Sequence, residues 1–271
     1  MISAMLISDS QIATWISAGW LPFVRISAAM MAAPLFSHRA IPRQIRLGVA
    51  LMLAVLLMPW QPAMPLQEGG IFNPLSLQGV LLTANELILG ICLGFMLQLV
   101  FEAVMFAGQF VATGMGLGFA SVIDQQQGIS VAVMGQFFML ITMLLFLAMN
   151  GHLAFIKLLA DSFVAWPVGT AVVQPETFGV LLTAIGGMLR NALGIALPAV
   201  VALLVVQIAM GVMSRAAPTL NLFAVGFPVT LMIGLLVVER TLPALLPQVQ
   251  RLITIAFSNM SLILESAHVI R

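Results

Sequence analysis

The sequence has few of the residues on which soluble proteins depend. Only 7% of its 271 residues are charged and tyrosine is absent, whereas 62% are hydrophobic and the mean hydropathy is +1.14. Soluble globular domains carry about 25% charged residues, so this composition excludes them and indicates an integral membrane protein. The net charge is +1 and the charges are scattered, which argues against nucleic acid as a partner.

The scarcity of cysteine and histidine excludes further kinds of site. Cys92 has no second cysteine with which to form a disulfide or a thiolate metal site within one chain. The three histidines (His38, His152 and His268) are far apart in sequence and form no ligand pattern, so we expect no metal and no other cofactor. The motifs of zinc peptidases, serine hydrolases and P-loop enzymes are also missing, and we expect no enzymatic activity.

The apolar residues form segments that proline, glycine or a charge interrupts. These segments are 12–36, 47–58, 77–107, 129–149, 178–212 and 222–238, with a mixed stretch at 153–168 and a weaker apolar one at 252–264. Together they predict an all-α integral membrane protein with about six or seven broken hydrophobic helices, in a single membrane domain over 1–271. The second segment is shorter than the roughly 20 residues of a bilayer span, and the fifth is too long for one straight span. The N-terminus carries Asp9 and no basic n-region, so we expect it to remain as a helix and not to be cleaved.

The longest interruption between two strongly apolar segments is residues 108–130, GQFVATGMGLGFASVIDQQQGIS. Each glycine costs a helix about 1 kcal/mol relative to alanine, so the alternating glycines at 114, 116 and 118 predict a loop. Irregular backbone at membrane depth has to be buried in protein or line a watery cavity. This glycine-rich stretch is therefore the first candidate for a pore, a plug or a gate.

Two segments carry a stripe of small and polar residues at a spacing that places them on one helical face. In the third segment the stripe is Glu86, Gly90, Gly94, Gln98 and Glu102. In the fifth segment it is Gly186, Arg190, Gly194 and Pro198. Small residues at this spacing let another helix approach closely, so Gly90, Gly94, Gly186 and Gly194 are predicted helix-packing positions.

The charges within these segments need partners. A carboxylate in a membrane costs several kcal/mol unless it is paired, so we expect Glu86 or Glu102 to face Arg190. A proton or ion relay is the functional alternative, and we favour structural pairing because intramembrane charges usually find partners. Arg25 presents the same choice among snorkelling, pairing with an acid and contacting a partner subunit, and no sequence signal decides it.

Several stretches, in order along nearly the whole chain, resemble one family. They are APLF (33–36), IPxxIR (41–46), NExxxGxxxG (85–94), GMGLGFASVID (114–124), NGH (150–152) and SRxxPxLNxFxVGFP (214–228). In this order they resemble the FliR-type family of type III export-gate proteins, which serve flagella and, in related forms, virulence injectisomes. Flagellar use is favoured by the closer match of the glycine loop and of residues 215–228.

The resemblance implies a core subunit of a protein export gate. FliR-type proteins assemble with FliP-type and FliQ-type membrane subunits, work with FlhB-type and FlhA-type export components, and pass unfolded flagellar proteins across the bacterial inner membrane at the basal body. Their helices form bent hairpins packed in a helical hetero-oligomer. The broken and oversized segments of this sequence suit such an arrangement.

In that family a loop of the FliR-type subunit plugs the closed channel, and residues 114–128 match it by position and composition. The resemblance implies that the plug or gate comprises Gly114, Met115, Gly116, Leu117, Gly118, Phe119, Ile123 and Asp124. Met115, Leu117, Phe119 and Ile123 would occlude the channel, and the glycines would let the loop swing aside. An ordinary re-entrant connection is the alternative.

Two other functions stay open. A small-solute secondary transporter would use Glu86, Glu102 and Arg190 at mid-depth, although the paired inverted repeats that such transporters often have are not evident here. A passive membrane scaffold would differ from a gate only in whether the glycine-rich loop lines the path of the exported protein.

Overall fold

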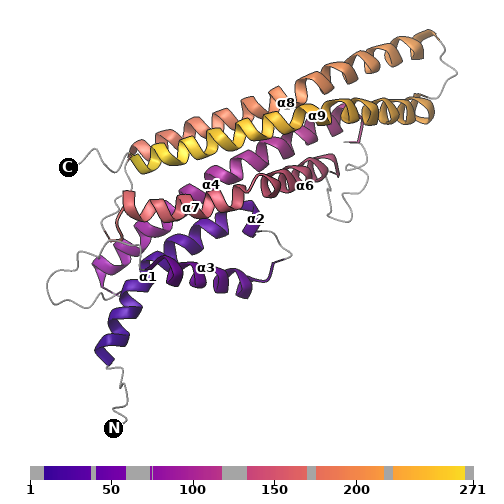
Figure 1. Ribbon diagram of the computed structural model, residues 1–271. Coiled ribbons are helices and arrows are strands. Elements are labelled where there is room, and N and C mark those ends of the chain that lie inside the picture. The colour runs from indigo at the N-terminus through magenta and orange to yellow at the C-terminus, as the bar shows by residue number, and fades with distance from the viewer. Residues whose placement is uncertain are drawn as a thin grey trace. The chain divides into compact units, whose positions relative to one another are not determined.

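Helices make up the regular structure of the described part of the chain. A computed structural model describes residues 9–37, 41–58, 74, 76–117, 133–169, 175–216 and 222–265. Within these ranges no strand occurs, which confirms the predicted all-α class. The helices are α1 (Asp9–Ala32), α2 (Pro34–Ser37), α3 (Arg43–Leu57), α4 (Leu77–Gly114), α6 (Val133–Ala148), α7 (Gly151–Ala165), α8 (Pro175–Ala216) and α9 (Leu222–Glu265) (Figure 1).

Three of the described helices have the length and the hydropathy of membrane spans. They are α4, α8 and the 226–265 part of α9, and a fourth span results if α6 and α7 are counted as one. The 42-residue α8 is about 60 Å long, roughly twice the thickness of a bilayer's hydrocarbon core, as its sequence length predicted. The 15-residue α3 is too short to span.

The break between α6 and α7 lies at the NGH motif. The two helices meet at an angle of 68°, and Asn150 between them has a positive φ of 56°. Asparagine adopts the left-handed region more readily than most non-glycine residues because its short polar side chain can bond locally. Asn150 therefore provides the turn that separates the two helices.

One predicted boundary between helices was wrong. The sequence predicted separate helices at 222–238 and 252–264, but α9 runs without interruption from Leu222 to Glu265 and contains Pro228, Pro243 and Pro247. Each proline removes one backbone hydrogen bond and bends a helix without having to end it. In an apolar environment, a full break would leave more backbone groups unsatisfied than a kink does.

The chain divides into two compact units. The first unit comprises 1–98, 151–183 and 256–271, and the second comprises 99–150 and 184–255. The helices α4, α8 and α9 each supply residues to both units. The two units therefore consist of interleaved segments, neither is a continuous stretch of sequence, and the single membrane domain over 1–271 stays a prediction.

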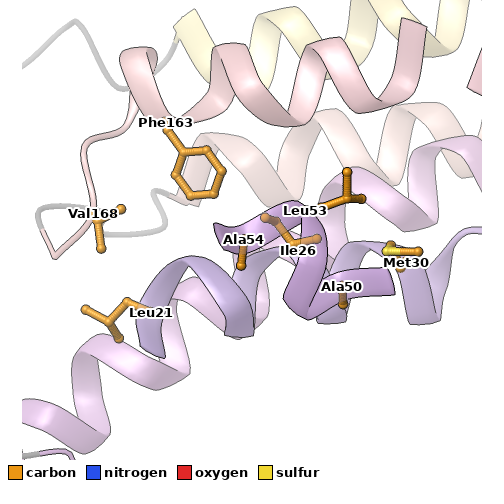
Figure 2. Close-up of a cluster of buried hydrophobic side chains, with 8 residues drawn as sticks. All are labelled: Leu21, Ile26, Met30, Ala50, Leu53, Ala54, Phe163 and Val168. Carbon is orange, nitrogen blue, oxygen red and sulfur yellow. The ribbon is translucent and has the colours of Figure 1, made fainter. Parts of the chain in front are cut away.

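The core of the first unit includes a cluster of buried apolar side chains from α1, α3 and the C-terminal part of α7 with the turn that follows it (Figure 2). Small residues let α3 approach α1, since Ala50 and Ala54 stand one turn apart and both are buried. The cluster comprises Leu21, Ile26, Met30, Ala50, Leu53, Ala54, Phe163 and Val168.

The core of the second unit includes a close contact between α4 and α6. The rings of Phe101 and Phe146 meet edge to face with centroids 5.6 Å apart, and both side chains are buried. Further along α4, a Cβ on Gly108 would lie 2.7 Å from the carbonyl oxygen of Met134 and 2.9 Å from the Cα of Gly135. The absent side chain of Gly108 thus lets the backbone of α6 approach α4.

Candidate functional site: the glycine loop and a buried ion pair

The glycine-rich stretch begins as helix. The sequence predicted a loop from Gly108, but α4 continues to Gly114, so the predicted start of the loop was wrong. The close packing of α6 against Gly108 accounts for the difference, because tertiary contacts offset the cost of about 1 kcal/mol that glycine imposes on a helix. Of the predicted plug residues, Gly118, Phe119, Ile123 and Asp124 lie outside the described residues.

Gly116 ends α4 with a Schellman motif. Its φ is +81°, its N–H donates to the carbonyl of Thr113 at 3.1 Å, and the N–H of Leu117 donates to the carbonyl of Ala112 at 3.0 Å. These are the two bonds that define the motif, and the left-handed residue at its centre is usually glycine. Gly116 therefore sets the direction in which the chain leaves α4 and enters the loop.

The last turn of α4 is bonded to α8. The carbonyl of Gly114 is among the last four of the helix, which lack a partner within it. Gln207 donates from Nε2 to this oxygen at 2.7 Å. A Cβ on Gly114 would lie 3.1 Å from Cδ1 of Leu203, so α8 also packs closely against this turn.

The side chain of Met115 is buried in a notch on α9. Met115 is 0% exposed, and the notch exists because Gly234 has no side chain. A Cβ on Gly234 would overlap Cγ of Met115 and lie 2.7 Å from its Cε. The hydroxyl of Thr230, one turn earlier on α9, lies 3.4 Å from the carbonyl oxygen of Met115. Met115 thus packs inside its own chain, and its expected role in occluding a channel stays a prediction.

The first unit contains a buried ion pair between α1 and α4. Arg25 Nε donates to Oε2 of Glu86 at 2.6 Å, and the side chains are 0% and 1% exposed. The other carboxylate oxygen, Oε1, accepts from the backbone N–H of Gly169 at 3.2 Å. Of the two carboxylates expected to face Arg190, Glu86 therefore pairs with Arg25 instead, and the choice left open for Arg25 resolves to pairing with an acid.

Two glycines of α4 account for this pairing. A Cβ on Gly90 would overlap the carbonyl oxygen of Arg25 and lie 2.8 Å from Cβ of Ala28. A Cβ on Gly94 would overlap the carbonyl oxygen of Ala29, and Cβ of Ala32 would be 2.7 Å away. The backbones of α1 and α4 are thus close enough for Arg25 to reach Glu86, one turn before Gly90.

The guanidinium of Arg25 also bonds the C-terminal end of α7. Nη1 donates to the carbonyl of Ser162 at 2.9 Å, and Nη2 donates to the carbonyl of Trp166 at 2.9 Å. The group lies 4.5 Å from the ring centroid of Phe163. A positive charge is favourable at a helix C-terminus, where the macrodipole is negative. The indole of Trp166 in turn donates to the carbonyl of Leu264 on α9 at 2.9 Å.

The remaining predicted site residues lie apart from these contacts. Glu102 is half-buried on α4 and Arg190 is exposed on α8, and their pairing stays a prediction. At Gly186 and Gly194, also on α8, no atom of another described element lies within 4 Å of the place where a Cβ would be. These two glycines therefore present an open face, unlike Gly90 and Gly94.

Sequence reasoning missed several residues that stabilise the end of α4 and several that stabilise the ion pair. Gln207 and Gly234 contact the end of α4, and Ser162, Trp166 and Gly169 complete the ion-pair network. No motif or period marks them, because each contact joins residues far apart in sequence. The sequence signals for the ion pair were the position of Arg25 among apolar residues and the position of Glu86 on a stripe with glycines.

Known proteins resemble this chain over most of its length. The model of the family described as bacterial export proteins, family 1, matches residues 16–255. Flagellar biosynthetic protein FliR of Pectobacterium carotovorum subsp. carotovorum is 36% identical over 250 residues, which cover 92% of this chain and 94% of that protein. FliR of Escherichia coli (strain K12) is 31% identical over 252 residues, 93% of this chain and 94% of that protein. FliR of Bacillus subtilis (strain 168) is 29% identical over 243 residues, 89% of this chain and 92% of that protein.

Proposed function

The chain belongs to family 1 of the bacterial export proteins, and we propose that it is the FliR-type core subunit of a flagellar protein export gate. The observation that carries this proposal is the similarity to FliR proteins over about nine-tenths of both partners. This similarity and the apolar helices support a membrane component of the flagellar export apparatus.

In the proposed gate, the chain forms a channel together with FliP-type and FliQ-type subunits in the inner membrane at the basal body. Unfolded flagellar proteins pass through this channel, and FlhB-type and FlhA-type components act with it. The glycine-rich loop that follows Gly116 closes the pore at rest. The Schellman motif at Gly116 supports a loop role, because it ends α4 at a residue with a left-handed backbone.

The surface of α8 supports membership of a larger membrane assembly. Only 17% of its most apolar window is buried within the chain. The side chains that are half or more exposed include Leu182, Leu189, Leu193, Leu197, Val201, Leu204, Val205, Ile208 and Val212. Such a face suits lipid or neighbouring helices, and the open glycines at 186 and 194 suit a helix that approaches closely.

The ion pair weighs against a small-solute transporter. A transporter would need Glu86 to exchange a proton or an ion with a watery path, whereas Glu86 is buried and bonded to Arg25 and Gly169. A carboxylate held in this way is typical of a structural pair. The export gate is therefore the better-supported function.

The decisive experiment is purification of the tagged chain from native membranes in mild detergent, with mass spectrometry of the proteins that accompany it. We expect a large complex that contains FliP-like and FliQ-like membrane proteins. Deletion of the gene should abolish secretion of flagellar subunits. Recovery of the chain alone, together with normal secretion in the deletion strain, would contradict the proposal.

A further inference from the structure

We propose that a groove between α7 and α9 binds the head group of phosphatidylethanolamine, a zwitterionic membrane lipid. The groove lies within the first unit, and its walls are residues of α7 between 154 and 165 and residues of α9 between 257 and 265. Its volume is about 380 Å³, which is in the range of small-molecule sites and suits a head group rather than a whole lipid. The inference does not depend on the proposed export gate, because it concerns only the contact of this chain with lipid.

The two helices end at the same end of the groove. Trp166, directly after α7, donates from its indole to the carbonyl of Leu264, near the end of α9, at 2.9 Å. Leu158 and Phe257, each about two turns earlier on its helix, both line the groove. The candidate membrane span of α9 also ends here, at Glu265, so this end of the groove is expected at the level of the lipid head groups.

Three charged side chains line the groove in a defined order. Lys157, the only lysine in the sequence, comes first, Asp161 follows about one turn later on α7, and Glu265 stands at the end of α9. All three are exposed, and within the described part of the chain no hydrogen bond or ion pair engages any of them. The groove therefore offers a cation first and two carboxylates closer to the ends of the helices.

This order of charges matches the head group of phosphatidylethanolamine, in which the phosphate lies next to the glycerol and the amine lies farther out. Lys157 would bind the phosphate, and Asp161 and Glu265 would bind the ammonium. Ser261 on α9 supplies a third acceptor, because its hydroxyl already donates to the carbonyl of Ser258 at 2.8 Å and keeps lone pairs. A primary ammonium has three N–H donors, so it can satisfy all three acceptors.

Apolar side chains line the groove beside the lysine. Leu158 and Phe257 are half-buried and lie on the side away from the helix ends. They can pack against the start of an acyl chain while the charged end of Lys157 reaches the phosphate, since a lysine stem is itself apolar. The groove thus has apolar and charged parts in the same order as the lipid.

Other ligands fit these charges less well. A free phosphate or an anionic lipid would bind Lys157 but would leave Asp161 and Glu265 without a cation. A basic segment of another protein would pair with the carboxylates but would bring a like charge towards Lys157. Phosphatidylcholine carries both charges, but its quaternary ammonium has no N–H to donate. The groove should therefore select phosphatidylethanolamine.

The test is native mass spectrometry of the full-length chain, purified in mild detergent together with any subunits that accompany it. The probes are phosphatidylethanolamine, its monomethyl and dimethyl derivatives and phosphatidylcholine, all with the same acyl chains. Because each methyl group removes one N–H donor, we expect retention of the lipid to fall stepwise. Phosphatidylethanolamine should bind about two- to fivefold more tightly than phosphatidylcholine, which is the range that exposed charge pairs give. Equal retention of the four lipids would overturn the inference, as would retention of none, the result expected if a protein segment covers the groove.

Substitutions separate the two halves of the site. Asp161→Asn combined with Glu265→Gln should abolish the preference for phosphatidylethanolamine over phosphatidylcholine, and a preference that survives would overturn the inference. Lys157→Gln should weaken the binding of both lipids alike, and unchanged binding would also overturn it. Glu239→Gln is the matched control, because this exposed carboxylate lies on α9 outside the groove, and its preference should equal that of the wild type.

A soluble competitor distinguishes a lipid from a free head group. Glycerophosphoethanolamine carries the same phosphate and ammonium but has no acyl chains to pack against Leu158 and Phe257. At the same concentration it should therefore leave the bound phosphatidylethanolamine in place. Displacement by this competitor as effective as that by the lipid itself would mean that the groove binds a soluble compound, and would overturn the inference of a lipid site.

Discussion

Gly90 and Arg25 are in backbone contact: a Cβ on Gly90 would overlap the carbonyl oxygen of Arg25. The same arginine reaches Glu86 with its side chain, one helical turn away on α4. The absence of a side chain at position 90 and the presence of a charge at position 86 are therefore parts of a single arrangement. A substitution at position 90 or at position 86 should therefore change the contacts of the other residue, because both contact Arg25 on α1.

Gly90→Ala should destabilise the protein even though alanine is the better helix former. The methyl group would push α1 away from α4 and lengthen the bond between Arg25 and Glu86. We expect a loss of about 1–3 kcal/mol in the free energy of unfolding, as for other overpacked contacts. Thermal unfolding of the purified protein in detergent measures this loss.

Gly48→Ala on α3 is the control for that experiment, because no atom lies within 4 Å of a Cβ there. Alanine should be neutral or stabilising by up to about 1 kcal/mol at this position. Equal unfolding temperatures for Gly90→Ala and Gly48→Ala would contradict the close contact between α1 and α4.

Loss of one partner of the ion pair should be more damaging than loss of both. Arg25→Leu or Glu86→Leu leaves an unpaired charge in an apolar interior, and removal of one member of a buried pair costs about 3–5 kcal/mol. The double variant leaves no charge and should regain part of this loss, although α7 would still lack the cation at its C-terminus. Unfolding in detergent and secretion of flagellar subunits provide the two readouts.

The double variant also distinguishes a structural pair from a proton relay. A structural pair predicts that secretion recovers in proportion to the amount of folded protein. A relay predicts a stable and assembled double variant that does not secrete at all.

Trp166→Phe should loosen the end of α9. The substitution keeps an aromatic ring but removes the hydrogen bond from the indole to the carbonyl of Leu264, which is buried. Leaving that oxygen unsatisfied costs about 1–3 kcal/mol. Hydrogen–deuterium exchange should rise in the last turns of α9, near residue 264.

Trp20→Phe is the matched control, because its indole bond to Thr83 is at an exposed position. Water or lipid headgroups can replace an exposed partner, so the effect should be smaller. Equal exchange in the two variants near residue 264 would refute the role of Trp166.

Gly116→Val should disturb the exit from α4 more than Gly116→Asn does. The φ of +81° is costly for a β-branched residue, while asparagine is the usual substitute for glycine at this position of a Schellman motif. We expect a cost of about 1–2 kcal/mol for valine and, if the chain forms the proposed gate, a faster ion leak from the assembled complex. Spheroplast swelling compares the two variants, and an equal leak would show that the backbone at Gly116 does not direct the loop.

Local signals in the sequence were enough for the fold class and for most helices. Apolar runs located α3 and α6 to within a few residues, the mixed stretch at 153–168 coincides with most of α7, and composition established the membrane environment. The prediction of two separate helices within α9 was wrong, because proline bends a helix more readily than it ends one in apolar surroundings. The prediction that the loop starts at Gly108 was wrong for a similar reason, because packing against α6 outweighs the low helix propensity of this glycine.

The sequence alone did not reveal which elements come together. Arg25 and Glu86 are 61 residues apart in the chain, and Trp166 and Leu264 are 98 residues apart. The spacing of Gly90 and Gly94 identified the two glycines but not α1 as their neighbour. Met115 looked like an exposed apolar residue of a loop, and only the notch at Gly234 explains its burial.

The distance in sequence between Arg25 and Glu86 has a consequence for biosynthesis. The ribosome makes α1 before α4, so Arg25 reaches the membrane before its acid exists, and an unpaired arginine is costly in lipid. We therefore expect α1 to stay at the bilayer surface in nascent chains that stop before residue 86, and to become protected from protease in chains that extend beyond residue 169. If α1 is protected equally in both, the pair does not time its insertion. If α1 is protected only in the longer chains, the synthesis of Glu86 controls when α1 enters the membrane, and it does so before the chain binds any partner subunit.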